Sequence, residues 1–230
     1  MARELLFLLG GSEGTFDLVA DEFVPAAGGR EAVIVLLFAF AQGWEDHLTE
    51  YVDPWIRRGA TRHHVITPDE RGNLDLDQVS SRLREATGIF IGGGNTALYH
   101  QLYATEPMRS IIRARYQAGV PVAGVSAGAL ISPEVCIVHE KTPEGRRPRI
   151  ASGLGLLSDL LVEVHFADHQ DSLAWLLDAM CATRIGRGLG IDSTACAMLV
   201  DGEVQRVLGQ SVHEVRMTDF DCGTHAVSVL

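Results

Sequence analysis

Gly124-Val125-Ser126-Ala127-Gly128 is the most informative segment of this chain of 230 residues. It completes the apolar run 120–125 and precedes small residues that open a helix, which makes it a G-x-S-x-G turn between a buried strand and a helix. Small residues on both sides of the serine let the strand and the helix approach closely. Such a turn presents the serine hydroxyl near the positive end of the helix. The pattern predicts Ser126 as a nucleophile, and a plain strand-to-helix turn with a spectator serine is the alternative.

Short apolar runs alternate with amphipathic segments along the first half of the chain. Strands are expected at residues 5–9, 32–40, 63–66, 88–91 and 120–125. Helices are expected at residues 15–26, 45–58, 76–85, 96–103 and 106–118. The runs from Ala32 and Val120 are continuously hydrophobic, which is typical of parallel strands buried on both faces. The alternation predicts an α/β fold with a three-layer, doubly wound, mostly parallel sheet.

The second half of the chain is less regular. Its expected elements are short strands at 135–138, 160–165, 190–192, 196–200 and 204–208, and a helix at 172–183. Asp201-Gly202 is a hairpin turn signal. The segment 141–149, rich in proline and arginine, is expected to be a polar loop. Since no linker or repeat interrupts the chain, we predict a single domain over residues 1–230.

Composition excludes several classes of partner. The net charge of -11 disfavours nucleic acid and anionic membranes, because phosphate binding requires a basic surface. No run reaches the ~20 apolar residues of a membrane helix, and residues 5–9 are interpreted as a first strand and not as a signal peptide. The four cysteines lack C-x-x-C and zinc-ligand spacing, so we expect reduced thiols, no metal and a cytoplasmic location. A serine nucleophile needs no organic cofactor, so none is expected. Apolar helix faces are compatible with a homodimer.

Three loops of small or polar residues are expected at the carboxyl ends of the strands, where such sheets bind ligands. They are residues 10–14, residues 92–96 and the Ser126 turn. None has a complete phosphate-binding motif, which disfavours a nucleotide. Three consecutive glycines instead let a backbone N–H point at a substrate oxyanion. We predict Gly94 and Ala127 as the oxyanion donors.

Nucleophilic serine requires a base that takes its proton. We predict His165, at the end of the strand expected at 160–165, as that base. His139 also lies near a strand end, whereas His100 and His169 fall on helix-like segments. Asn95, Thr96 and His169 are predicted to contact the substrate.

Four blocks of the sequence resemble those of the dipeptidase E and cyanophycinase family of serine peptidases. They are Ile91-Gly92-Gly93-Gly94-Asn95-Thr96, Gly124-Val125-Ser126-Ala127-Gly128-Ala129, Val164-His165-Phe166 and Gly190-Ile191-Asp192-Ser193-Thr194-Ala195. The resemblance implies a class I glutamine amidotransferase-like (flavodoxin-like) fold with serine in place of the amidotransferase cysteine. It implies cleavage of short peptides or of β-linked aspartyl chains. It also marks Ser126 as nucleophile and His165 as base, and it supports Gly94 and Ala127 as oxyanion donors.

The resemblance places the acid of the triad after the serine turn and shortly before a proline, where Glu140 lies. Glu140 would hold the imidazole in the right tautomer and stabilise the imidazolium. Asp168, Glu134 and Asp192 remain open as alternatives.

Substrate preference is less constrained. Family members that prefer aspartyl substrates resemble each other in carrying arginines shortly after the base histidine, but residues 166–172 hold no arginine and two acids, Asp168 and Asp171. A substrate carboxylate could instead be bound by arginines elsewhere, namely Arg146, Arg147, Arg149, Arg184 or Arg187. Alternatively, the two acids could favour a free amino terminus or a basic side chain.

The sequence therefore predicts a cytoplasmic serine exopeptidase that hydrolyses short peptides, aspartyl-X among the candidates, through a Ser-His-Glu triad and an acyl-enzyme. A cyanophycinase-like β-aspartyl peptide hydrolase is one alternative. A non-catalytic binding protein on an amidotransferase-like scaffold is a second, because a fold does not dictate a function. An esterase or amidase is a third.

Overall fold

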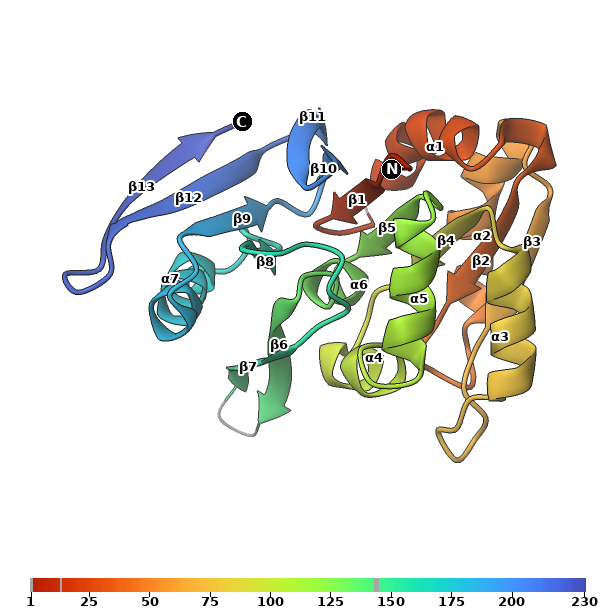
Figure 1. Ribbon diagram of the computed structural model, residues 1–230, viewed down its shortest axis with the longest axis horizontal. Coiled ribbons are helices and arrows are strands. Elements are labelled where there is room, and N and C mark those ends of the chain that lie inside the picture. Colours follow the sequence, from red (N-terminus) through yellow and green to blue (C-terminus); the bar gives the residue numbers. More distant parts are fainter. Residues whose placement is uncertain (1, 13, 143–144) are drawn as a thin grey trace.

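The computed structural model describes residues 2–12, 14–142 and 145–230, without the side chains of residues 141–142 and 145–147. Its centre is a seven-stranded sheet in the order β11-β10-β1-β5-β4-β2-β3 (Figure 1). The parallel strands are β1 (Leu5–Leu9), β2 (Val33–Leu37), β3 (Arg62–Ile66), β4 (Gly88–Ile91) and β5 (Val122–Val125). Two antiparallel strands, β10 (Ala195–Val200) and β11 (Glu203–Gly209), extend one edge. The predicted mostly parallel sheet is confirmed.

Helices cover both faces of this sheet and complete three layers. One face carries α1 (Thr15–Ala26) and α2 (Glu45–Arg57), and a short 3-10 turn, Gly29–Glu31, leads into β2. The other face carries α3 (Leu76–Glu85), α4 (Thr96–Tyr103), α5 (Met108–Gln117) and α6 (Ala127–Leu130). Successive side chains of a strand point to opposite faces, so in β1 Leu6 and Leu8 join one core while Phe7 and Leu9 join the other. None of the helices in the described part of the chain is long and apolar enough to cross a membrane.

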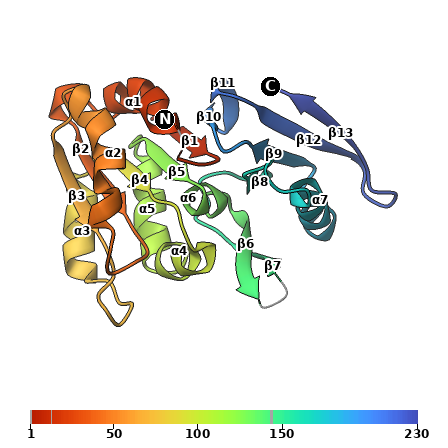
Figure 2. The same cartoon turned by 180° about the vertical axis from the view of Figure 1, so that it is seen from behind.

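A second, four-stranded sheet in the order β13-β12-β9-β8 lies beside the first (Figure 2). It consists of β8 (Leu161–Val164), β9 (Arg187–Ile191), β12 (Val212–Asp219) and β13 (Thr224–Val229). Helix α7 (Ser172–Thr183) packs on it through Leu176 and Met180, which contact a small core that includes Leu161 and Val215. Strands β6 (Val135–Thr142) and β7 (Gly145–Ser152) form a separate hairpin that projects below the two sheets.

The prediction of a polar loop at residues 141–149 was wrong, because that segment belongs largely to the β6–β7 hairpin. Its backbone groups pair in a regular antiparallel register, for example Val138 with Arg149, and this pairing does not require apolar side chains. The sequence also gave no signal for β12 and β13. Most side chains of β13 are exposed, so the strand lacks the apolar alternation that marks a buried one.

The crossing of β5 and α6 leaves no room for a side chain at two glycines. A Cβ atom on Gly124 would lie 2.5 Å from the carbonyl carbon of Gly128, and a Cβ atom on Gly128 would lie 2.5 Å from the carbonyl oxygen of Ile91. Backbone atoms cannot move aside as the end of a flexible side chain can. The turn that carries Ser126 therefore depends on glycine at both positions.

We expect Gly124→Ala to lower the free energy of unfolding by roughly 1–3 kcal/mol, because the added methyl overlaps backbone of the next helix. Gly186→Ala is the matched control, since an added Cβ there meets nothing closer than 3.8 Å. Its effect should stay within about 0.5 kcal/mol. Urea unfolding with comparison of midpoints and slopes measures both. A Gly124→Ala variant as stable as the wild type would contradict this account of the crossing.

Candidate active site

Ser126 occupies a strained turn between β5 and α6. Its backbone has φ 51° and ψ −107°, a conformation that residues other than glycine rarely adopt. The N–H of Ser126 donates to the carbonyl oxygen of Leu9 on the neighbouring strand at 2.9 Å, and α6 begins at the next residue. The surrounding structure thus holds the turn in place and presents the hydroxyl at the carboxyl end of the central sheet.

The imidazole of His165 lies against this hydroxyl, with 3.0 Å between Ser126 Oγ and His165 Nε2. His165 directly follows β8 and also has a positive φ, 52°. Beyond it, the N–H of Phe166 donates to the carbonyl oxygen of Ile191 at 3.2 Å, and the N–H of Ala167 donates to Asp192 at 3.1 Å. The structure therefore brings together the predicted nucleophile and the predicted base, each carried by a different sheet.

Ser193 and Asp168 continue the line of hydrogen bonds beyond His165. The Nδ1 atom of His165 lies 2.6 Å from Ser193 Oγ, and the Ser193 hydroxyl also bonds the Asp168 carboxylate. An ionised carboxylate only accepts, so Ser193 donates to Asp168 and accepts from Nδ1–H of the imidazole. This arrangement leaves Nε2 unprotonated and able to accept the proton of Ser126. It selects the tautomer that a general base needs.

Glu140, the predicted acid of the triad, does not lie beside His165. It stands on β6, where its carboxylate pairs with Arg149 on β7, and both side chains are nearly half exposed. Of the alternatives, Glu134 is exposed. Asp192 is buried and accepts from the Ala167 N–H. Asp168 is the acid of this set that is hydrogen-bonded to His165 through Ser193. Glu140 is paired with Arg149 instead, because both residues lie on the β6–β7 hairpin.

The two predicted oxyanion donors are Gly94, in the loop after β4, and Ala127, the residue after Ser126. Ala127 is the first residue of α6, so its N–H has no acceptor within the helix. Gly94 has φ 140°, a conformation that favours glycine, and it lines both cavities that contain Ser126. Gly94 and Ala127 therefore stay the predicted oxyanion donors.

The loop that carries Gly94 is held close to the nucleophile. The N–H of Gly92 donates to the carbonyl oxygen of Leu37 at 3.0 Å, and the N–H of Gly93 donates to the Tyr51 hydroxyl at 3.4 Å. Burial raises the pKa of Tyr51 to about 12, so its hydroxyl stays neutral near pH 7. A Cβ atom on Gly93 would lie only 3.3 Å from that of Ser126, which shows how closely the loop approaches.

Of the three residues predicted to contact the substrate, two line a cavity beside Ser126 and one does not. Asn95 caps α4, and its side-chain oxygen accepts from the N–H of Ala97 at 3.0 Å. Asn95 and Thr96 nevertheless line the smaller of the two cavities beside Ser126. The ring of His169 lies beside that of His165, with 6.2 Å between centroids, but His169 lines neither cavity.

Two cavities meet at Ser126 and His165. The smaller one, of about 50 Å³, extends to Leu130 and to the buried side chains of His139 and Glu163. The larger groove, of about 350 Å³, leads past Ser12 to His47 and Glu50 on α2, and is also lined by Gly11, Phe40, Tyr51, Gly93, Gly94 and Val125. Within the described residues, no group of three or more His, Cys, Asp or Glu side chains is arranged to hold a metal ion.

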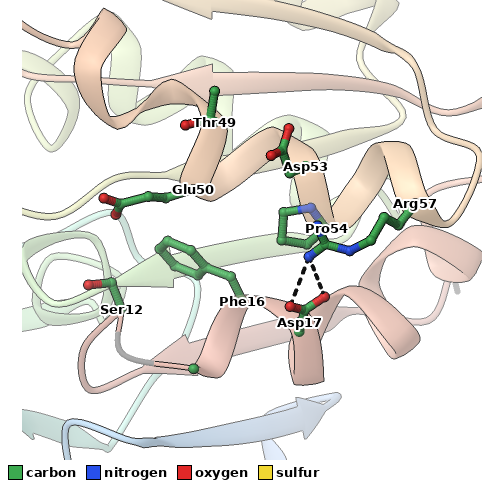
Figure 3. Close-up of a pocket in the computed structure, with 9 residues that line it drawn as sticks. Ser12, Phe16, Asp17, Thr49, Glu50, Asp53, Pro54 and Arg57 are labelled. Carbon is green, nitrogen blue, oxygen red and sulfur yellow. Dashed lines mark hydrogen bonds and ion pairs between the residues drawn. The ribbon is translucent and has the colours of Figure 1, made fainter.

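A third pocket, of about 560 Å³, lies between α1 and α2 (Figure 3). It shares Ser12 and Glu50 with the groove but contains neither Ser126 nor His165. At its other end, Arg57 and Asp17 form an ion pair at 2.8 Å. The predicted nucleophile and base therefore line the other two cavities and not this pocket.

Two site residues were missed in the sequence. Ser193 lies in the block 190–195, which was noted only as part of the family resemblance. Glu163 lies within Leu161-Val162-Glu163-Val164, where all four side chains are buried. A carboxylate in an otherwise apolar strand was the available signal, since such a group is rarely buried without a partner.

Comparison with known proteins identifies the family. A sequence profile of peptidase family S51 matches residues 6–207, which include all four residues of the hydrogen-bonded line. Cyanophycinase of Synechococcus elongatus is 29% identical over 214 residues, covering 90% of this chain and 66% of that protein. Peptidase E of Shewanella amazonensis is 38% identical over 89 residues, covering 38% of this chain and 37% of that protein. The chain thus spans about two thirds of the length of this cyanophycinase.

Solved structures share the fold. A peptidase from an acI-B1 actinobacterium superposes with a TM-score of 0.66 at 19% identity, over 91% of this chain and 89% of that one. A putative peptidase E protein of Listeria monocytogenes superposes with a TM-score of 0.60 at 14% identity, over 94% of this chain and 100% of that one. The resemblance to dipeptidase E and cyanophycinase is confirmed, and the chain belongs to peptidase family S51, a family of serine peptidases.

Proposed function

We propose that this protein is a serine exopeptidase that hydrolyses short peptides, with Ser126 as nucleophile and His165 as general base. The observation that carries the proposal is the unbroken line of hydrogen bonds from Ser126 through His165 and Ser193 to Asp168. Membership of family S51 and the similarity to peptidase E support the same chemistry.

In the first half of the reaction, Ser126 Oγ attacks the scissile carbonyl carbon while His165 Nε2 takes the hydroxyl proton. The carbonyl oxygen becomes an oxyanion between the N–H groups of Gly94 and Ala127. The imidazolium is stabilised because Nδ1–H donates to Ser193, whose own proton is bonded to Asp168. The C–N bond then breaks, and His165 returns its proton to the leaving amine.

In the second half, water attacks the acyl ester on Ser126. His165 Nε2 takes one proton of the water, and the resulting tetrahedral oxyanion occupies the same two N–H groups. The ester C–O bond breaks, and the proton passes from His165 to Ser126 Oγ. The products are a free carboxylic acid and the starting enzyme, so each turnover consumes one water.

The cavities support an exopeptidase. The smaller cavity, about 50 Å³, is closed by His139 and Glu163 and has room for a side chain but not for further residues. A cavity needs roughly 10–15 Å³ for a single water, so the whole space corresponds to a few water-sized groups. The larger groove, about 350 Å³, has room for the leaving residue. Short peptides therefore fit the site better than the interior of a long chain.

The described arginines give little support for an aspartyl preference. Arg149 pairs with Glu140, Arg184 lies 3.6 Å from Asp221, and Arg187 pairs with Glu203 and Glu214. These partners satisfy the guanidinium groups away from Ser126. The side chains of Arg146 and Arg147, which the sequence also offered, lie outside the described residues. Cyanophycinase-like hydrolysis remains the second candidate, since cyanophycinases match across 90% of this chain.

We also propose a cytoplasmic location. All four cysteines are free thiols, and two of them, Cys136 and Cys196, are buried. Burial raises the pKa of the Cys136 thiol to about 12, which keeps it protonated and unreactive. Reduced, inert thiols are typical of proteins in a reducing compartment.

We expect Ser126→Ala to lower kcat for dipeptide hydrolysis by roughly 10⁴-fold or more, because the acyl-enzyme cannot form. The measurement is release of free amino acids from a dipeptide library varied at its first residue. Ser158→Ala is the control, since Ser158 is exposed and lines neither active-site cavity. Full activity of Ser126→Ala would refute the mechanism, and a wild type that neither cleaves peptides nor reacts with a serine-directed phosphonate would favour a binding protein.

We expect Ser193→Ala and Asp168→Asn each to lower kcat by roughly 10²–10⁴-fold with little change in KM, since both loosen control of the imidazole tautomer. Ser193→Thr, which keeps the hydroxyl, should recover part of the loss. Steady-state kinetics with the preferred dipeptide measures all three variants.

Two controls accompany these variants. Asp171→Asn removes a nearby exposed carboxylate that makes no capping hydrogen bond to α7. Glu140→Gln removes the acid predicted from the sequence. Both should retain near wild-type kcat. A large loss of kcat in Glu140→Gln, with none in Asp168→Asn, would identify Glu140 as the acid of the triad.

A further inference from the structure

A buried histidine–glutamate pair forms the inner wall of the smaller cavity. Nε2 of His139 lies 2.9 and 3.0 Å from the two carboxylate oxygens of Glu163, and the side chains are only 7% and 2% exposed. The N–H of Val164 also donates to Glu163, at 3.3 Å. Both residues line the cavity that contains Ser126 and His165, yet the mechanism above does not use them.

The hydrogen bonds of the pair determine what the cavity offers. An ionised Glu163 can only accept, so the proton between the two groups belongs to Nε2 of His139. The Glu163 carboxylate lines the cavity and offers about four lone-pair sites, more than the bonds from His139 and Val164 occupy. A substrate group that donates a hydrogen bond to this carboxylate would therefore be stabilised.

The charge of the cavity lining also favours an uncharged donor. Among the described residues, the lining of the cavity contains neither lysine nor arginine, and Glu163 is its carboxylate. A second carboxylate, brought in by a substrate, would meet like charge where little water can screen it. An uncharged donor meets no such repulsion.

Size limits the choice further. A volume of about 50 Å³ corresponds to roughly three or four water-sized groups. The side chains of serine, threonine and asparagine are this small and each carries a donor. Longer side chains, such as glutamine, lysine or an aromatic residue, exceed the space.

The smaller cavity suits the residue that stays on the enzyme as the acyl group. It ends at buried walls formed by Leu130, His139 and Glu163. The larger groove leads away along α2 to the exposed side chains of His47 and Glu50. The leaving amine must depart before water attacks, and the groove provides that path.

We propose that the His139–Glu163 pair determines specificity by selecting peptides whose first residue has a short, uncharged hydrogen-bond donor. Asparagine, threonine and serine are accepted, and aspartate is rejected. The inference rests on the proposed peptidase function and names the substrate class of the same site.

The test compares kcat/KM for X-Leu dipeptides with X as Asn, Thr, Ser, Asp, Gln or Leu. Wild type should prefer Asn-Leu over Asp-Leu by roughly 100-fold, the scale of a like-charge penalty of a few kcal/mol. Glu163→Gln keeps the shape and removes the charge, so it should reduce the Asn/Asp ratio at least about tenfold. Glu214→Gln is the matched control, a buried glutamate paired with Arg187 at 2.7 Å in the second sheet, and it should keep the wild-type ratio.

The outcomes separate this inference from the function on which it rests. A wild type that cleaves no dipeptide and does not react at Ser126 with a small phosphonate lacking a side chain defeats the proposed function itself. Cleavage of Asp-Leu as fast as Asn-Leu defeats only the specificity, as does a ratio that Glu163→Gln leaves unchanged. Circular dichroism checks the fold of each variant, and if Glu163→Gln does not fold, the wild-type preference decides alone.

Discussion

At Ser126, strand β5 passes into helix α6 through a turn with a strained backbone. A positive φ at a serine is unfavourable, and here it is held by the hydrogen bond to Leu9 and by the contact of Gly124 with Gly128. The same crossing starts α6 at Ala127. The proposed nucleophile, Ser126, and one proposed oxyanion donor, the N–H of Ala127, are therefore positioned by the same local geometry.

A second close approach sets the base relative to the nucleophile. At the end of β1, a Cβ atom on Gly10 would lie 2.2 Å from the carbonyl oxygen of Asp192, so the two sheets meet backbone to backbone. The Asp192 carboxylate also fixes Ala167, just beyond His165. Glycine at position 10 thus lets the loop after β9 come close enough for His165 to reach Ser126.

The polar groups around Ser126 and His165 form two sets, one with a proposed role in the reaction and one with a proposed role in substrate specificity. Ser193 and Asp168 lie on the Nδ1 side of His165 and orient the imidazole. His139 and Glu163 lie along the cavity wall and bond each other. The hydrogen bonds of each set hold its own side chains in place, which suits the two sets to different steps of the proposed reaction.

The parallel sheet, the turn at Ser126 and the choice of His165 could be predicted from the sequence, because apolar runs, small residues and positions at strand ends are local features of the chain. The hydrogen-bond partner of His165 could not be predicted in this way, since Ser193 and Asp168 are 25 residues apart and meet through loops after different strands. Glu140 fitted the family's spacing, yet backbone pairing in the hairpin directs it to Arg149. The small cavity with its His139–Glu163 wall is likewise a product of packing between β6 and β8, because strands distant in the chain set the space left between them.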